Sequence, residues 1–338
     1  MRMSRRGPAL LLLTLTVAGC GGSGAKRSVD ARVEALRFFG PDAPLVALVD
    51  TDAEAKDDRA ALDASLGGLP VWDSLRRRVA RSLARAGMAP DRLRALAAAA
   101  GSEGGLPGSQ LAVGVETSGR RPQPLAVLVT DKAAEMRNMF EQAARSGRLS
   151  PAGELDDADL YTSRGAAFAV RDGVMLAAAT PALVRVAIRT RDGDRGEQLD
   201  DRNVADLLEE VPENAPLDVY ANVPGLVESD PAVAELAQPP VAWLNSLREV
   251  ALAVSGTPRG LRIDAFGRLD ESPPADQAPP IGQRPRISAL SRHAVAGLVG
   301  GGAAAPLSLH DLLVEAAPFV VAATVDGDEL RATLRSAP

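Results

Sequence analysis

Short apolar runs bounded by glycine, proline or acidic residues recur along the chain, a pattern typical of buried strands. One run, residues 45–49, stands alone, and two pairs follow, residues 111–115 with 125–129 and residues 166–171 with 174–179. Within the second pair, Asp172-Gly173 predicts a tight hairpin turn. The pattern therefore predicts strands joined by hairpins, with further strands at residues 159–162, 250–254, 261–266 and 319–325.

Helical periodicity separates these runs, because apolar residues three and four positions apart lie on one face of a helix. Asp131 is the predicted N-cap of one helix, and Thr180 caps another whose first residue is Pro181. Since hairpin strands and helices are segregated, we expect an α+β fold with antiparallel sheets and helices packed on one side. The predicted helices cover residues 28–39, 71–86, 91–100, 131–146, 180–188, 287–296 and 307–316.

The second half of the chain restarts the pattern of the first. Residues 41–49 resemble residues 212–220, and each segment is followed by helical sequence and then by a pair of strands. Self-similarity of this kind indicates a tandem duplication of a strand–helices–hairpin unit. We therefore predict a first α+β half at residues 30–200 and a second at residues 201–338, the second containing a Pro-rich loop at residues 271–285.

The N-terminal segment has the order of a secretory signal. Arg2, Arg5 and Arg6 form a basic region, and the apolar run 8–18 is too short to span a membrane. Val17-Ala18-Gly19-Cys20 then has the form of a bacterial lipobox, in which the cysteine thiol is acylated and the chain is cleaved between Gly19 and Cys20. An ordinary secretory signal with an unrelated cysteine is the alternative, but Cys20 lies where a cleavage site belongs.

These features predict a signal peptide at residues 1–19 and a flexible, Gly-rich tether at residues 20–29. Stable anchoring needs more than one acyl chain, a condition that palmitate-type diacylation or triacylation of Cys20 meets. Cys20 is the single cysteine, so no disulfide framework is expected. We expect an extracytoplasmic protein that is lipid-anchored to the cell membrane.

Composition narrows the function classes. The formal net charge of −6 becomes −9 once the three arginines of the signal are removed, which makes nucleic acid a poor partner. Aromatic residues are 3% of the chain, so platforms for stacking sugars or bases are scarce. No polybasic patch is expected to bind anionic lipid, so the anchor on Cys20 must hold the protein at the membrane.

Candidate catalytic groups are few. The chain has only two histidines, His293 and His310. A hydrolase triad drawn from Ser291, His310 and Asp311 has only sequence adjacency in its favour, so a surface or capping role is the preferred interpretation of these side chains. We therefore predict no catalytic residue and no cofactor.

Metal-ligating patterns are equally incomplete. Asp50, Asp52 and Glu54 begin like a calcium loop, but Ala55 stands where glycine is expected and Ala61 where glutamate is expected. A solvated turn is therefore preferred there, and no metal site is predicted. Asp192 with Asp194 and Glu197 is a second calcium candidate, for which a solvated loop is preferred.

The remaining candidates concern other chemistry. Asp156, Asp157 and Asp159 lie too close to the predicted turn at Pro151-Ala152-Gly153 for paired acid/base roles. The basic stretch 76–85 could face lipid headgroups or an acidic partner, but a solvated face is preferred. The glycine-rich stretch 297–302 could let the backbone approach a ligand, but a loop is preferred.

Four segments resemble a bacterial exported family. They are Pro41–Val49, Ala158–Tyr161, Ala167–Ala177 and Thr180–Leu183, and the similarity covers most of the chain from about Arg37 onward. The family is known as domain of unknown function 3352, and its members often follow a signal peptide or lipobox. Its motifs are structural, so the resemblance implies a fold and an export route but no activity and no site residue.

These observations favour a membrane-anchored cell-envelope lipoprotein whose body is a non-enzymatic interaction or scaffold module. Its expected partners are the membrane, through the lipid on Cys20, and an envelope protein or lipid. The first alternative is a binder or carrier of an apolar or lipidic ligand, since the body is aliphatic and poor in aromatic residues. A hydrolase is a distant alternative.

Overall fold

The structure is a computed structural model. It describes residues 29–51, 56–67, 110–116, 123–163, 166–194, 197–199, 204–212, 215–229, 246–257, 260–270, 319–326 and 329–336. These residues form two compact units, which we name by their place in the chain. The N-terminal unit contains the described residues of 29–57 and 110–205, and the C-terminal unit contains those of 58–67 and 206–336.

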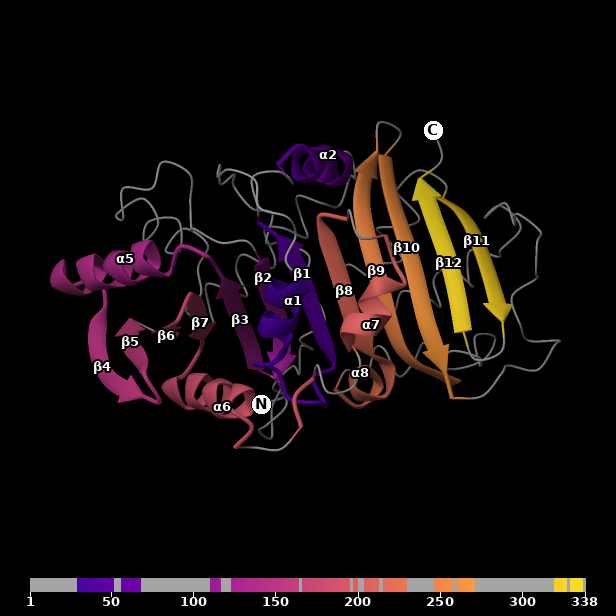
Figure 1. The fold of residues 1–338 in the computed structure, drawn as a ribbon. Helices are drawn as coiled ribbons and strands as arrows, with labels where there is room; N and C mark the ends of the chain where they lie inside the picture. Colours follow the sequence, from indigo (N-terminus) through magenta and orange to yellow (C-terminus); the bar gives the residue numbers. More distant parts are fainter. Residues whose placement is uncertain are drawn as a thin grey trace, which may run out of the picture. The chain divides into compact units, whose positions relative to one another are not determined.

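The N-terminal unit is an antiparallel sheet with helices (Figure 1). Within it the strand order is β1-β2-β3-β7-β6-β5-β4, and each neighbouring pair is antiparallel. The α+β class expected from the sequence is therefore confirmed. In chain order its elements are α1 (Val29–Leu36), β1 (Leu45–Asp50), β2 (Gln110–Glu116), β3 (Gln123–Val129), α5 (Ala133–Arg145), β4 (Ser150–Leu155), β5 (Ala158–Ser163), β6 (Ala166–Arg171), β7 (Val174–Ala178) and α6 (Pro181–Arg191).

Two-residue turns fix the register of this sheet. The predicted turn joins β6 to β7, with Asp172 at φ 42° and Gly173 at φ 81°, so that Arg171 pairs with Val174. Both turn residues occupy the left-handed region, as the mirror-image hairpin turns require. A Cβ on Gly173 would lie 2.5 Å from the carbonyl oxygen of Thr130, so glycine is needed for space as well as for conformation.

Helices cover both faces of the N-terminal sheet, so the expectation of helices on one side is wrong for this unit. Alternate residues of a strand point to opposite faces. The ring of Phe168 lies 5.9 Å from that of Phe140 in α5, whereas Ala169 faces α1 and α6. The reason is the sequence of β6 and β7, which is apolar and buried on both faces and therefore needs cover on both.

The strands of the C-terminal unit follow the order β8-β9-β10-β12-β11, and each neighbouring pair is antiparallel. Helix α2 packs at the β9–β10 hairpin, where Ser65 Oγ donates a hydrogen bond to the carbonyl oxygen of Gly260 (3.2 Å) and a Cβ on Gly256 would overlap the backbone of Ala61. Its elements are α2 (Lys56–Gly67), α7 (Val204–Glu209), β8 (Leu217–Asn222), α8 (Val223–Ser229), β9 (Leu247–Thr257), β10 (Gly260–Leu269), β11 (Phe319–Asp326) and β12 (Glu329–Ser336).

Local signals succeeded for one helix and failed for another. Thr180 caps α6 as predicted, since its Oγ1 accepts a hydrogen bond from the backbone N–H of Leu183 (3.3 Å) and Pro181 follows. The predicted cap Asp131 is wrong, because α5 begins after Lys132 and has no side-chain cap. Instead, Thr130 Oγ1 accepts from the backbone N–H of Lys132 (3.0 Å) and orders the approach to the helix.

Two strands were not predicted. Pro151, Ala152 and Gly153 are typical of a turn, but they lie in β4, which has a register shift between Pro151 and Gly153. The predicted last strand, Phe319–Val325, is followed by one more, β12. Helices predicted at residues 71–86, 91–100, 287–296 and 307–316, and the Pro-rich loop at 271–285, lie outside the described residues. None of the described helices is long and apolar enough to cross a membrane.

Candidate functional site

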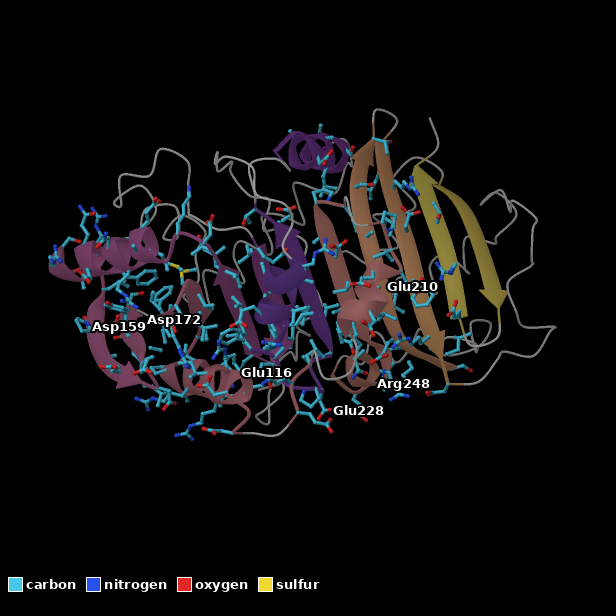
Figure 2. All side chains as sticks on the ribbon, viewed as in Figure 1. Glu116, Asp159, Asp172, Glu210, Glu228 and Arg248 are labelled. Atoms are coloured by element: carbon cyan, nitrogen blue, oxygen red, sulfur yellow. The ribbon has the colours of Figure 1, made fainter. Side chains whose placement is uncertain are left out.

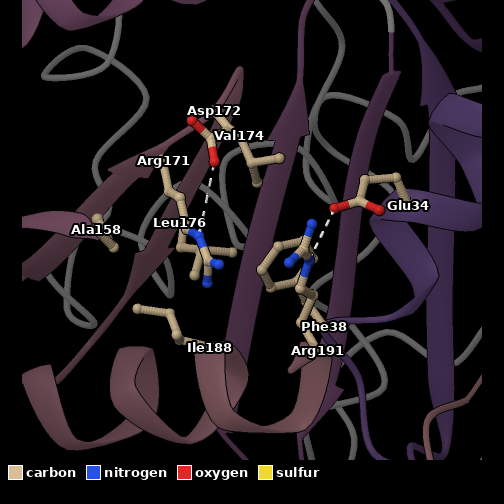
Figure 3. A pocket seen from close by; sticks show the side chains of 10 residues that line it. Glu34, Phe38, Ala158, Arg171, Asp172, Val174, Leu176, Ile188 and Arg191 are labelled. Carbon is tan, nitrogen blue, oxygen red and sulfur yellow. Dashed lines mark hydrogen bonds and ion pairs between the residues drawn. The ribbon is translucent and has the colours of Figure 1, made fainter. Parts of the chain in front are cut away.

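Charged side chains converge where α1, β6 and α6 meet in the N-terminal unit. Helix α6 directs one face into the core through Leu183, Val184 and Ile188, which are buried. Helix α1 is placed by Phe39, which fits against β2 because the residue there is glycine: a Cβ on Gly114 would lie 2.5 Å from the Phe39 ring. These contacts bring the last turn of α6 beside the side chain of Glu34 (Figure 3).

Four of these side chains form a continuous chain of ion pairs, which we name the Arg–acid chain: Arg171, Asp192, Arg191 and Glu34. Arg171 Nη1 donates to both oxygens of Asp192, at 3.0 and 2.7 Å, and Arg191 Nη1 donates to Asp192 Oδ1 at 3.0 Å. Arg191 Nε donates to Glu34 Oε1 at 3.1 Å. Each acid thus lies against at least one arginine, and the chain links β6, the end of α6 and α1.

Beneath these charges lies a small cavity of about 20 Å³ (Figure 3). Apolar side chains from the sheet and the two helices form most of its wall, with Arg171 and Arg191 also lining it. A volume of this size holds roughly one water molecule. The apolar residues of the wall are Phe38, Ala158, Ala169, Val174, Leu176 and Ile188.

The electrostatics of the Arg–acid chain favour full ionisation. Burial alone would raise the pKa of Asp192, but hydrogen bonds from Arg171 and Arg191 outweigh it and hold that pKa below its ordinary value. Burial likewise opposes the charge on Arg191, yet the hydrogen bond to Asp192 and the charge of Glu34 raise the pKa of its guanidinium. Opposite charges at hydrogen-bond distance stabilise both ionised forms.

This arrangement can fasten structural elements together, and it is poorly suited to proton transfer. A general acid or base works best with a pKa near the operating pH, and the pKa of Asp192 is displaced away from neutrality. The Arg171 Nε atom is buried without a hydrogen-bond partner and lies 3.9 Å from Asp172 Oδ2. Asp192 is therefore held as an anion between Arg171 and Arg191.

A second polar set lies on the sheet of the C-terminal unit. Tyr220 is fully buried and its hydroxyl donates to Glu249 Oε1 at 3.1 Å. Nearby on the same sheet face, Thr333 Oγ1 donates to Asp264 Oδ1 at 2.7 Å, and Arg262 Nη2 donates to the same oxygen at 3.0 Å. These buried acids are bonded by neighbouring strands, which ties the strands of the sheet together.

One exposed contact on that sheet joins a strand to the chain beyond α7. Arg331 Nη2 lies 2.6 Å from Glu210 Oε2, and the guanidinium carbon lies 4.7 Å from the centre of the Phe266 ring. Glu210 is labelled in Figure 2, beside α7. The side chains of Arg331 and Glu210 are both half-exposed, so water screens this ion pair and it stabilises the unit only modestly.

Most of the site residues proposed from the sequence lie outside the described part of the chain. These are Gly19, Cys20, Asp52, Glu54, Ser291, His293, His310 and Asp311, together with the stretches 76–85 and 297–302. Asp50, by contrast, is buried at the end of β1.

The acidic clusters that the structure does describe are not brought together as metal ligands. Asp192 bonds arginines, while Asp194 and Glu197 are exposed. Asp156 and Asp157 form the β4–β5 turn at φ 47° and 63°, and Asp159 lies 4.0 Å from Arg137 Nε. Within the described residues, no group of three or more His, Cys, Asp or Glu side chains is placed to hold a metal ion.

Sequence reasoning missed the Arg–acid chain. Glu34 and Arg191 are separated by 157 positions, and nothing in the local pattern pairs them. Arg171 precedes β7 and Asp192 follows α6. Their meeting could have been inferred only from a strand followed by a helix that packs back on it, which returns the chain to its starting point.

Comparison with known proteins identifies no family. No family model matches the chain, and no curated protein matches it. Among solved structures, three crystal forms of the protein TP0453 are similar to it. Form III has a TM-score of 0.43 and 10% identity, covering 89% of this chain and 94% of that one. Form I has a TM-score of 0.40 and 9% identity over 90% and 91%, and form IV a TM-score of 0.40 and 10% identity over 91% and 95%. Likeness at these TM-scores carries no argument about fold or function.

Proposed function

We propose that this protein is a cell-envelope lipoprotein, anchored through acyl chains on Cys20, whose two α+β units form a non-enzymatic interaction or scaffold module. The observation that carries the proposal is Val17-Ala18-Gly19-Cys20, placed directly after a basic and then apolar segment. The resemblance to domain of unknown function 3352 supports the same export route. The proposed location is the outer surface of the cell membrane.

The chemistry of the described polar groups supports a scaffold. Asp192 and Glu34 are held by arginines, and Glu249 accepts from a buried tyrosine. A satisfied buried polar group such as Glu249 makes a fold more specific, and the partly exposed pairs of Asp192 and Glu34 add to this only modestly. Well-ordered units that follow the Gly-rich tether predicted from the sequence suit a protein that presents surfaces to partners near a membrane.

The cavity of the candidate site does not favour the alternative of an apolar-ligand carrier. Its volume of about 20 Å³ is far below the several hundred Å³ of ordinary ligand pockets. An acyl chain would require α1 or α6 to move away from the sheet. This cavity therefore gives the carrier alternative no support.

The strand plans of the two units support the proposed tandem duplication. In the N-terminal unit, β1 is followed by the β2–β3 hairpin, and the β6–β7 hairpin then places β7 beside β3. In the C-terminal unit, β8 is followed by the β9–β10 hairpin, and the β11–β12 hairpin places β12 beside β10. On this proposal, α5, β4 and β5 are an elaboration found in the N-terminal repeat.

The anchor is tested by metabolic labelling with an alkyne fatty acid in cells that express the full chain. We expect the wild-type protein to be labelled and to sediment with membranes. Cys20→Ala should lose the label and retain the uncleaved signal peptide, because the acylated thiol is required before cleavage at a lipobox. Mass spectrometry of the N-terminus reports both changes.

A matched variant separates the lipobox from a cysteine in general. Cys20→Ala combined with Ser23→Cys restores a thiol three positions later, outside the lipobox, and should remain unlabelled. Fatty-acid labelling of either variant, or an unlabelled wild-type protein cleaved elsewhere, overturns the proposed anchor.

A further inference from the structure

Strand β11 ends the sheet of the C-terminal unit. Among the described strands it pairs only with β12, through a register that runs from Phe319 opposite Ser336 to Asp326 opposite Glu329. The outer edge of β11 therefore presents backbone N–H and C=O groups that no described strand uses. An open edge of this kind is a template for pairing with another strand.

Proteins usually protect such edges, and the two terminal strands β4 and β11 differ in this respect. Strand β4, at the end of the N-terminal sheet, contains Pro151, a register shift and Gly153 at φ 99°. Proline and bulges are recognised ways to block edge pairing. Strand β11 reads Phe-Val-Val-Ala-Ala-Thr-Val-Asp, with no proline and with its single charge at the last position. This strand therefore lacks the proline, the register shift and the mid-strand charge that blunt an edge.

The N-terminal unit shows what covers the equivalent edge. Strand β6 occupies the same place in its sheet as β11. Each is the first strand of a hairpin, and the second strand of that hairpin pairs with β3 in the N-terminal unit and with β10 in the C-terminal unit. The outer edge of β6 is paired by β5 in antiparallel register, with Tyr161 opposite Phe168. An antiparallel strand is therefore the occupant that this position in the fold accepts.

Hairpin geometry decides which residues of β11 face outward. Two residues separate the paired Asp326 and Glu329, and a two-residue hairpin is closed by a hydrogen-bonded pair. Because such pairs alternate along an antiparallel ladder, the even-numbered residues bond to β12. The backbone groups of Phe319, Val321, Ala323 and Val325 are then directed away from β12.

We propose that β11 pairs with β11 of a second copy of this chain, antiparallel and about a two-fold axis at Ala322. In this register Ala322 faces Ala322 of the other copy, Val321 faces Ala323, and Phe319 faces Val325, so every outward group finds a partner. No charged residue lies opposite another, because Asp326 falls outside the paired stretch. Two-fold pairing of one surface with itself is the commonest form of association. The proposal goes beyond the proposed function and names a partner for the interaction module.

The test is disulfide cross-linking of the full chain in its native membranes. Cys20 is the only native cysteine, so an introduced cysteine reports one position. Directly opposed residues of a non-hydrogen-bonded pair lie within disulfide reach. Ala322→Cys should therefore give a covalent dimer under mild oxidation. Its neighbour Ala323→Cys is the matched control and should cross-link about tenfold less, because its two-fold mate is offset along the strand.

A second pair of variants tests the backbone. Adding Ala323→Pro to Ala322→Cys removes an outward N–H and should abolish the cross-link, whereas adding Ala323→Gly keeps that N–H and should preserve it. Circular dichroism confirms that each variant is folded. A dimer band from the chain without an introduced cysteine would come from a free thiol on Cys20. That band would contradict the proposed acylation of Cys20, and the comparison of positions 322 and 323 would still decide the pairing of β11. Equal cross-linking at positions 322 and 323, or none at position 322, overturns the proposal.

Discussion

The sheets of the two units follow similar strand plans but differ in the hydrogen bonds and ion pairs that their charged side chains make. In the N-terminal unit, β6 and β7 are apolar on both faces, and the Arg–acid chain lies at the rim, where α1 and α6 meet the sheet. In the C-terminal unit, Tyr220, Glu249 and Asp264 lie buried on the sheet itself. The chain's two tyrosines show the contrast, since the ring centre of Tyr161 lies 5.4 Å from that of Phe140 in a tilted contact, whereas Tyr220 donates a hydrogen bond to a carboxylate.

This difference indicates that hairpin connections, rather than polar contacts, determine the shared plan. Two-residue turns are found in both sheets, and both bury polar residues at strand ends, Asp50 opposite Gln110 in one and Asn222 opposite Glu249 in the other, but the side-chain hydrogen bonds described above differ between them. A buried carboxylate is costly unless it is bonded, so each unit has to satisfy its own set locally. The two units should therefore respond differently to the loss of an aromatic ring, of a hydroxyl and of a charge.

The largest effect is expected for Phe140→Ala. Phe140 is buried and contacts Tyr161 and Phe168, and removing a buried phenylalanine ring costs about 3–5 kcal/mol of unfolding free energy. Amide hydrogen exchange should show lost protection in β5 and β6. Strands β9 and β10 should keep their protection, because the buried side chains of the C-terminal unit make their own polar and apolar contacts.

Phe140→Leu is the control for that variant, since it retains most of the buried volume and should cost less. Equal loss of protection in β9 and β10 would show that the units unfold together. The different interiors of the two units would then not give them separate stabilities.

An intermediate effect is expected for Tyr220→Phe. The change keeps the ring but removes the hydrogen bond to the buried Glu249, and an under-satisfied buried acceptor costs about 1–3 kcal/mol. Tyr161→Phe is the matched control, because the contribution of Tyr161 is its ring contact with Phe140. Urea unfolding of both variants measures the comparison, and equal destabilisation by the two would contradict it.

The sequence predicted the elements whose signals are local. The apolar strands, the Asp172-Gly173 turn and the Thr180 cap of α6 all depend on residues a few positions apart. Strand β4 escaped prediction because Pro151 and Gly153 are typical of turns, and only pairing with β5 holds that segment extended. Strand β12 alternates polar and apolar residues, which is the pattern of a half-buried strand, so its signal was present in the sequence and was missed.

The candidate site was much less predictable than the fold. The Arg–acid chain depends on α1 and α6 packing beside one another on the sheet, and its partners Glu34 and Arg191 are far apart in sequence. Composition shows that arginines and acids are plentiful, but it cannot show which of them meet. The expectation of helices on one side failed for a similar reason, because a fully apolar strand does not reveal which helices cover each face.

The smallest effect is expected for Asp192→Asn at the rim of the N-terminal sheet. The folded-state pKa of Asp192 lies below its ordinary value, so its contribution to stability is fully present above that value. The contribution is lost as the pH falls through the folded-state pKa, where the carboxylate protonates. The side chain is 20% exposed and its partners are partly solvated, so about 1 kcal/mol at neutral pH is the expected size.

The pH profile distinguishes this charge effect from a simple loss of packing. The free energy of unfolding of the Asp192→Asn variant should approach that of the wild type as the pH is lowered below 3.8, the ordinary pKa of the carboxyl group. Asp194→Asn is the control, since Asp194 is exposed and lies two residues away, and its profile should follow the wild type. A deficit in Asp192→Asn that stays constant from neutral to acidic pH would mean that shape, not charge, holds α6 to β6. The rim of the N-terminal sheet would then resemble its apolar interior more closely than the hydrogen-bonded acids of the C-terminal sheet.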